Sequence, residues 1–249
     1  MIIEQLNQTH LLTITIMPVL AFLLMFFSLR KQNEKTQTTV LLIICIINAV
    51  FYAVYKVAQA YDPDYNFNLF TNLPLHFCNI NLILLPLAIA TKNKNLLAYQ
   101  LYFGTGLAFV ALLTVDPAFR SKSIFAFTCF FYFYYHSMLM VIPYLLLALK
   151  RYRPSFRYIL QPILLLVSLT FIMHLVNIVF RSTGLAADAN YFYTFGMDGD
   201  SFNESLRRLI PYNLLYLLPT LIFFIPQILI VTFPYYLIDR RKHREKLGK

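Results

Sequence analysis

The sequence predicts an all-α protein, a polytopic membrane helix bundle with seven transmembrane helices. Hydrophobic residues make up 59% of its 249 residues and charged residues only 13%, whereas a soluble domain of this size needs roughly a quarter of its residues charged. The apolar residues come in long runs, and about 20 of them in a helix cross a hydrocarbon core. In hydrocarbon every backbone polar group must be paired within its own segment, which favours helices.

Seven apolar runs are the predicted spans, and together they form one predicted transmembrane domain over residues 1–249. Their approximate limits are 11–29, 38–58, 73–91, 95–114, 123–149, 158–180 and 211–238. The fifth and seventh runs are long enough to tilt or kink, and both contain prolines. Neighbouring helices and polar side chains can satisfy the carbonyls that these prolines leave unpaired.

The distribution of Lys and Arg predicts the orientation. Fifteen of these residues follow the first, third, fifth and seventh runs, and five fall on the other side. By the positive-inside rule the N-terminus lies outside, and the basic tail 239–249 is cytoplasmic. The stretch 181–210 is then an extracellular loop. Glu4 and the lack of a basic segment before the first run argue against a cleavable signal peptide, so we expect a multi-pass protein of the cell membrane.

The net charge of +10 does not indicate a nucleic acid partner, because the basic residues sit in short clusters between apolar runs. We expect membrane lipids as partners, with anionic headgroups at the cytoplasmic face contributing about 1 kcal/mol per basic residue. The sequence leaves a protein partner open. The three cysteines, Cys45, Cys78 and Cys129, form no disulfide framework.

The third predicted span has the most polar side chains: Asn72, His76, Cys78, Asn79 and Asn81. At about 100° per residue, Asn72, His76 and Asn79 share one face. Cys78 lies about 160° from His76, so these two cannot act as adjacent nucleophile and base unless Pro74 distorts the turn. Cys78 and Asn81 share the other side. Amides in spans also join helices by hydrogen bonds, so a structural role stays open for Asn79 and Asn81.

Further histidines lie in later spans. His136 follows an aromatic run in the fifth span, and the sixth span has one polar face of Thr170, His174, Asn177 and Arg181. Polar groups at membrane depth are costly and are candidates for function. One polar cavity that opens outward would unite them. A metal site formed by the histidines lacks a supporting i, i+4 His/Glu pair, and we expect no metal and no cofactor.

Several short motifs carry a resemblance to a known family. They are 73–80 (LPLHFCNI), Tyr102-Phe103-Gly104, 111–114 (ALLT), Phe130-Phe131 with His136, Asn190-Tyr191 and Pro211-Tyr212. In this order, over roughly residues 70–215, they resemble the bacterial YwaF-type integral membrane proteins. That family is similar to the eukaryotic transmembrane protein 164 group, acyltransferases that remodel phospholipids with a membrane cysteine and a histidine on a later helix.

The resemblance implies that Cys78 is the catalytic cysteine and His136 its histidine. The chain departs from the family after Asn190-Tyr191, where a Lys-Pro and a Trp-rich motif are usual, since it has no Trp at all. If this loop contributes to substrate choice, that choice is open.

The leading hypothesis is therefore a membrane acyltransferase that acts on lipid through an acyl-thioester on Cys78, with His136 as base. The predicted substrate-binding residues are His76, Asn79, Asn81, His174, Asn177, Asn190 and Tyr191, and the amides of Asn79 or Asn81 are candidate oxyanion donors. The alternative is a non-enzymatic protein that binds or transports a small solute or lipid through an outward-facing polar pocket. A third interpretation is a structural subunit of a larger membrane complex.

Overall fold

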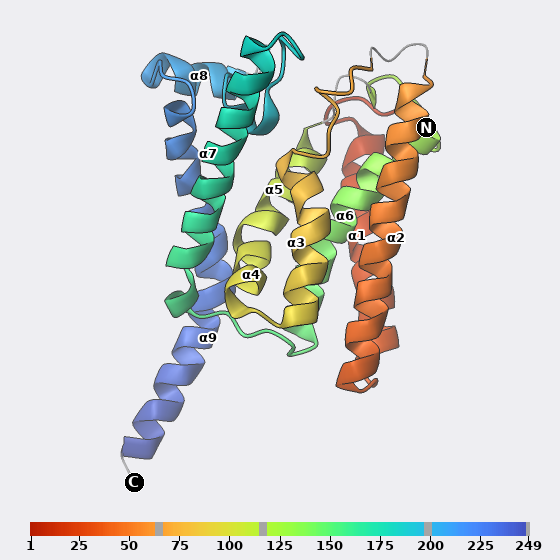
Figure 1. Cartoon of the computed structure of the whole chain (residues 1–249). Helices are drawn as coiled ribbons and strands as arrows, with labels where there is room; N and C mark the ends of the chain where they lie inside the picture. Colours follow the sequence, from red (N-terminus) through yellow and green to blue (C-terminus); the bar gives the residue numbers. More distant parts are fainter. Residues whose placement is uncertain (63–66, 115–118, 197–200, 248–249) are drawn as a thin grey trace. The chain divides into compact units, whose positions relative to one another are not determined.

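The fold is all-helical, as the sequence predicts. We describe a computed structural model in which residues 1–62, 67–114, 119–196 and 201–247 are defined (Figure 1). Within these ranges there is no β-strand beyond one isolated bridge between Ile2 and Ser123.

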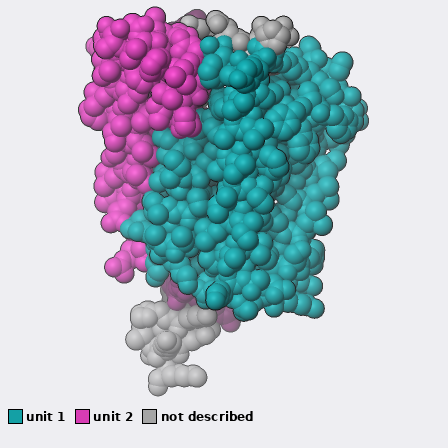
Figure 2. Space-filling model, turned by 45° about the vertical axis from the view of Figure 1, so that its right-hand side comes forward, with its two compact units in different colours: residues 1–67, 77–152 teal, residues 68–76, 153–249 magenta. Residues whose placement is uncertain are grey.

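The chain forms two compact units (Figure 2). Unit 1 comprises residues 1–67 and 77–152, and unit 2 comprises residues 68–76 and 153–249. The boundary at residue 77 falls inside the third predicted span, so the short stretch before that residue packs with the C-terminal part of the chain.

Six helical segments among the described residues are long and apolar enough to cross a membrane. They are α1 (Gln8–Leu29), α2 (Glu34–Ala60), Lys94–Leu113, α6 (Phe127–Ala148), Phe156–Ser182 and Leu215–Arg241. The chain is thus a multi-pass membrane protein. The third predicted span forms the shorter helix α3 (Phe77–Thr91) of 15 residues, fewer than the roughly 20 that a full crossing takes. The seven-span count and the orientation of the termini remain predictions.

Helix α3 is short because the predicted span begins with a non-helical segment. Residues 72–75 carry no helix, and the Leu75 N–H donates to the Leu73 carbonyl at 2.7 Å in a tight turn around Pro74. A proline disfavours the helical conformation at the residue before it. The helix therefore starts at Phe77, and Cys78 is its second residue.

Unit 1 is organised around α6, against which α1, α2 and α5 (Thr105–Leu113) all pack. Aromatic rings fill part of this interior, for example the pair Tyr52–Tyr135 with ring centroids 5.6 Å apart. The span Lys94–Leu113 is not a regular helix. It consists of α4 (Lys94–Tyr99), a π-helical turn η1 (Gln100–Gly104) and α5. Such π turns occur frequently at functional sites.

In unit 2, α7 (Leu160–Ser182) follows the short turn η3 (Phe156–Tyr158). The predicted extracellular loop 181–210 contains η4 (Tyr191–Tyr193) and α8 (Ser201–Leu209); its residues 197–200 lie outside the described ranges. The last span starts as the 3₁₀ segment η5 (Leu215–Phe223), which contains Pro219, and continues as α9 (Phe224–Leu247). Helix α9 thus runs through most of the predicted tail 239–249, whose last two residues lie outside the described ranges.

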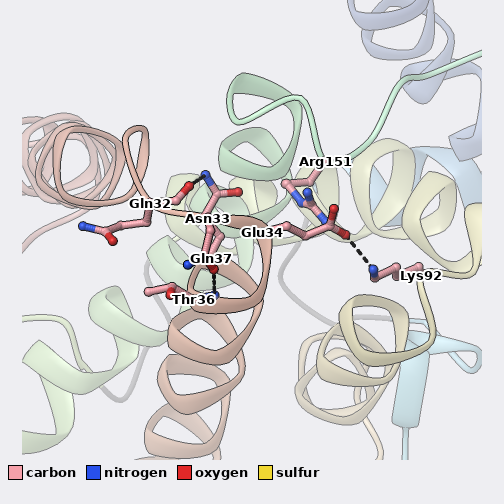
Figure 3. A network of polar contacts seen from close by, with 7 residues as sticks. All are labelled: Gln32, Asn33, Glu34, Thr36, Gln37, Lys92 and Arg151. Carbon is pink, nitrogen blue, oxygen red and sulfur yellow. Dashed lines mark hydrogen bonds and ion pairs between the residues drawn. The ribbon is translucent and has the colours of Figure 1, made fainter.

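An acidic residue joins three connections of unit 1 (Figure 3). Glu34, in the first turn of α2, pairs with Lys92 at 2.6 Å and with Arg151. Asn33 caps the same helix by accepting from the Thr36 N–H at 2.9 Å. Lys92 and Arg151 are two of the basic residues that predict the cytoplasmic side, and here they neutralise a carboxylate of the protein itself.

His10 was not singled out from the sequence, and it connects α1 to α5. The Leu6 N–H donates to His10 Nδ1 at 3.0 Å, so Nε2 carries the proton and donates to the Leu112 carbonyl at 2.7 Å. Leu112 belongs to the last turn of α5, where carbonyls lack an intrahelical partner. The fully buried His10 is therefore a neutral, hydrogen-bonded structural residue.

Replacing His10 by Ala should lower the thermal stability of the purified protein in detergent. The substitution leaves the buried Leu112 carbonyl without its donor, which costs about 1–3 kcal/mol. The matched control is Thr15→Ala in the same helix, whose exposed hydroxyl donates only to the Leu11 carbonyl one turn earlier. Equal melting temperatures for the two variants would contradict this role.

Candidate functional site

Cys78 lies at the N-terminal end of α3, in unit 1, and is partly exposed. The Tyr135 hydroxyl of α6 is placed to donate a hydrogen bond to its thiolate form. The first turn of a helix carries unpaired N–H groups and the positive end of the helix dipole, and both favour a thiolate. The other two cysteines, Cys45 and Cys129, are buried.

Tyr135 links Cys78 to its neighbour Asn79. Its hydroxyl donates to Asn79 Oδ1 at 2.8 Å, and both side chains are buried. Asn79 therefore acts as an acceptor here, with its carbonyl oxygen engaged by α6. Tyr135 was not among the residues singled out from the sequence, where it was one of several aromatics in a run before His136.

His136 is buried in α6 with a defined tautomer. Its Nδ1 lies 2.8 Å from the Tyr132 carbonyl, and because a carbonyl only accepts, Nδ1 carries the proton. In a neutral imidazole the other nitrogen, Nε2, then holds the lone pair that can act as a base. The His136 ring lies against the Tyr135 ring, with centroids 4.1 Å apart. The cysteine, the tyrosine and the histidine are thus in successive contact within unit 1.

Asn81 pairs with a residue that sequence reasoning missed. Gln100 Nε2, at the start of the π turn η1, donates to Asn81 Oδ1 at 3.1 Å. Each of these amides is only 1% exposed. Gln100 sits in an apolar run without helical regularity at that point, so its direction could not be read from a helical wheel.

The other predicted binding residues belong to unit 2, where Asn177 fixes the loop after α7. Asn177 Nδ2 donates to the Tyr191 carbonyl at 2.8 Å and to Thr194 Oγ1 at 2.9 Å, and its Oδ1 accepts from the Tyr191 N–H at 2.8 Å. One side-chain amide therefore pairs with both backbone groups of Tyr191. This gives Asn177 a structural role in holding η4 against α7.

Tyr191 extends the same network to the segment before α3. Its hydroxyl donates to the Phe70 carbonyl at 2.7 Å and accepts from the Leu73 N–H at 3.1 Å. The His76 ring packs edge-on against the Tyr191 ring, with centroids 5.1 Å apart. Tyr191 thus connects residues 70–76 with the loop after α7, all within unit 2.

His174 and Asn190 contact the same loop. His174 Nδ1 and Thr194 Oγ1 are hydrogen-bonded at 3.0 Å, and the ring stacks on Phe195. Asn190 Oδ1 accepts from the Phe195 N–H at 3.0 Å, and its Nδ2 donates to the Gly196 carbonyl. These contacts organise the loop, and contact of these side chains with a substrate stays a prediction.

The predicted site residues thus form two groups. Unit 1 holds Cys78, Asn79, Asn81 and His136, and unit 2 holds His76, His174, Asn177, Asn190 and Tyr191. A single cavity that unites them remains a prediction. Among the described residues, no group of three His, Cys, Asp or Glu side chains is suited to hold a metal ion.

These features define a polytopic helical membrane protein in which a cysteine faces a tyrosine hydroxyl and the ring of that tyrosine contacts the neighbouring histidine. The chain belongs to the TMEM164 family, whose family model matches residues 5–237. This confirms the resemblance to the transmembrane protein 164 group, whereas the YwaF-type assignment stays a prediction. No curated protein matches the chain, and no solved structure matches it.

Replacing Asn177 by Leu should loosen the loop after α7. The substitution removes the side-chain amide that pairs with both the N–H and the carbonyl of Tyr191. We therefore expect faster hydrogen–deuterium exchange at residues 190–196 in the detergent-solubilised protein. Thr170→Val is the matched control, because the Thr170 hydroxyl donates only to the Leu166 carbonyl in its own helix. Unchanged exchange of the loop in the Asn177 variant would show that other contacts hold it.

Alkaline pH should destabilise the protein through Tyr191. Burial raises the pKa of Tyr191 from its ordinary value of 10.0 to about 12, despite the opposing hydrogen bond from the Leu73 N–H. The folded state therefore keeps the proton that the unfolded state loses, so this contribution to stability is present below about pH 10 and is lost as the pH rises towards 12. Melting temperatures measured between pH 9 and 12 should fall less steeply for Tyr191→Phe. Parallel curves would contradict the assignment.

Proposed function

We propose that the protein is a membrane acyltransferase that transfers a fatty acyl group between lipids through a thioester on Cys78. One observation carries this proposal. A partly exposed cysteine at a helix N-terminus lies against a tyrosine hydroxyl, and the tyrosine ring touches a histidine whose tautomer leaves Nε2 as a base. Membership of the TMEM164 family supports it.

The first half-reaction forms the thioester. His136 Nε2 takes the thiol proton of Cys78, and the thiolate sulfur attacks the carbonyl carbon of an acyl ester. The ester C–O bond then breaks, and the leaving lipid oxygen takes the proton from the His136 imidazolium. In the second half-reaction, an acceptor hydroxyl gives its proton to His136 and attacks the thioester carbon, which restores the Cys78 thiol.

A thiolate in an apolar site needs compensation, and two features supply it. The Tyr135 hydroxyl can turn from Asn79 Oδ1 to the sulfur, which exchanges a neutral hydrogen bond for a charge-assisted one. The N-terminal end of α3 adds its positive dipole. Both stabilise the thiolate and so raise the fraction of Cys78 present as the nucleophile.

The substrates that fit this proposal come from the bilayer. The chain is a multi-pass membrane protein, so a nucleophile in its spans meets acyl chains and lipid esters at high local concentration. Unit 2 has an open apolar groove of about 380 Å³ lined by Leu75, Ile172, Leu175, Val176, Val179 and Phe180. A groove with this lining fits an acyl chain and has no side-chain hydrogen-bonding groups for a polar solute. The proposed location is the bacterial plasma membrane.

A non-enzymatic lipid- or solute-binding protein is the alternative, and the cysteine separates the two functions. If Cys78 only fills space, Cys78→Ser should leave binding and transport intact, and the side chains of His76, Asn79 and His174 should dominate the affinity. An acyltransferase predicts the reverse, because a serine hydroxyl is a far weaker nucleophile than a thiolate at neutral pH.

Cys78→Ala should abolish acyl transfer. The purified protein, reconstituted in phosphatidylethanolamine–phosphatidylglycerol vesicles, would be supplied with a phosphatidylcholine carrying a fluorescent acyl chain and with a lysophospholipid acceptor. We expect the wild type to acylate the acceptor and to carry a hydroxylamine-sensitive label on Cys78. His136→Gln should lower the rate by about 100- to 10,000-fold, the usual loss of a general base.

Cys45→Ala and Cys129→Ala are the matched controls, because both cysteines are buried in other helices, α2 and α6. They should retain transfer. Undiminished transfer by the Cys78→Ala variant would exclude the proposed mechanism.

A further inference from the structure

Unit 1 contains buried hydrogen-bond donors without a partner, Ser137 Oγ in α6 among them, and two of these donors belong to α3 and α4. They are Asn81 Nδ2 in α3 and the Tyr99 hydroxyl at the end of α4, and the two residues are 1% and 0% exposed. Buried polar groups in proteins are nearly always hydrogen-bonded, and an unsatisfied donor in a membrane interior is especially costly. Two such donors in adjoining elements therefore call for a functional explanation.

Both donors lie near the Cys78 sulfur. Asn81 is three residues after Cys78 on the same helix, and side chains at this spacing are neighbours, with Cβ atoms about 5–6 Å apart. The Tyr99 hydroxyl lies close enough to the Cys78 thiol to interact with it electrostatically. The two donors thus come from different helices, α3 and α4.

The orientation of the Asn81 amide is fixed from the π turn. Gln100 Nε2 occupies Asn81 Oδ1, so the Asn81 amide must direct its N–H₂ group elsewhere. Gly104, the last residue of η1, makes room for this pair. A Cβ atom at Gly104 would lie 2.7 Å from Gln100 Oε1 and 3.5 Å from Asn81 Nδ2, and the first distance is a clash. The π turn thus places the Gln100 amide so that it fixes the orientation of the Asn81 amide.

We propose that Asn81 Nδ2 and the Tyr99 hydroxyl form the oxyanion-binding site for the acyl ester attacked by Cys78, with Gln100 and Gly104 as positioning residues. This inference rests on the proposed acyl transfer. When the sulfur–carbon bond forms, the carbonyl π electrons move to oxygen, and the resulting oxyanion accepts one hydrogen bond from each donor. The electrons return when the ester C–O bond breaks.

The arrangement selects Asn81 over Asn79, which the sequence left as an equal candidate. Asn79 Oδ1 is engaged by Tyr135, and Tyr135 is the group that faces the sulfur. Asn81 Oδ1 is likewise engaged, by Gln100, but Asn81 Nδ2 and the Tyr99 hydroxyl are buried donors without a partner, and Asn79 Nδ2 is not such a donor. The proposed ligand is therefore a carbonyl group whose oxygen becomes negatively charged during the reaction, as in an oxygen ester or a thioester.

The test uses Tyr99→Phe and Asn81→Leu in the full-length protein, reconstituted in the same vesicles with the same fluorescent phosphatidylcholine donor. Removal of one oxyanion donor typically lowers kcat by about 100- to 1,000-fold, and we expect this loss with a KM changed less than about threefold. Tyr99→Phe should leave the melting temperature equal or higher, because it removes a hydroxyl that has no partner. A merely structural tyrosine would lose stability together with activity.

Reaction of Cys78 with methyl methanethiosulfonate separates the thiol from the oxyanion site. This reagent attacks sulfur without forming a carbonyl oxyanion, so both variants should modify Cys78, quantified by peptide mass spectrometry, at the wild-type rate. Gly104→Ala should displace Gln100 and lower kcat as well. Asn48→Leu and Tyr152→Phe are the matched controls, because they alter buried residues of the same types elsewhere in unit 1, and they should keep the wild-type kcat.

The outcomes distinguish the two proposals. If Cys78→Ala abolishes transfer while Tyr99→Phe and Asn81→Leu keep the wild-type kcat, the oxyanion site is wrong and the thioester mechanism stands. If Cys78→Ala retains transfer, the thioester mechanism itself is excluded. A parallel loss of kcat and melting temperature in Tyr99→Phe would assign that hydroxyl a structural role and would also overturn the oxyanion site.

Discussion

A polar group inside a membrane protein cannot form hydrogen bonds to water, so it needs a partner within the protein. This constraint explains most of the side-chain arrangement described above. In unit 2 the polar side chains satisfy this constraint. Asn177 pairs with both backbone groups of Tyr191 in the loop after α7. The Tyr191 hydroxyl pairs with the Phe70 carbonyl and the Leu73 N–H before α3, so each side chain uses both its donor and its acceptor capacity. Near Cys78 in unit 1 the same constraint is broken by two donors, Asn81 Nδ2 and the Tyr99 hydroxyl. Asn48 Oδ1 and Ser137 Oγ are also buried without a partner, so the assignment of Asn81 and Tyr99 to chemistry depends in addition on their relation to Cys78.

The position of Cys78 follows from a local feature of the backbone. Pro74 and the tight turn at Leu73–Leu75 delay the start of α3 to Phe77, so the cysteine falls in the first turn and not in the middle of a span. A thiol in the middle of an apolar helix is surrounded by groups that cannot stabilise a negative charge. In the first turn it has unpaired backbone N–H groups and the helix dipole. The late start of α3 therefore favours the thiolate form of Cys78.

The sequence could predict the features that depend on composition and on helical periodicity. The all-α class and the multi-pass character follow from long apolar runs. The helical wheel does not apply to His76 and Cys78, because His76 lies in the non-helical segment before α3, and the two residues belong to different units. The sequence could not predict partners between distant segments. Gln100 and Tyr135 looked like ordinary span residues, because a π turn shifts the first out of helical register and the second stands in a run of aromatics. His10 was overlooked because its role depends on the end of α5, about a hundred residues away. Such pairings are fixed by tertiary packing, on which a single sequence carries no direct signal.

The irregular turn at Gln100–Gly104 keeps the Asn81 amide in a fixed orientation. A regular helix would present its side chains at fixed intervals, and Tyr99 and Gln100 would point in directions about 100° apart with no accommodation for an amide pair. The π turn, together with a residue that lacks Cβ at Gly104, lets the Gln100 amide fold back beside its own helix and reach Asn81. A Cβ atom at Gly104 would fill that space, and the Gln100 amide would lose its orientation. The folded protein thus holds the two donors unsatisfied before a substrate binds. A preorganised site of this kind needs no reorganisation when negative charge develops on the substrate.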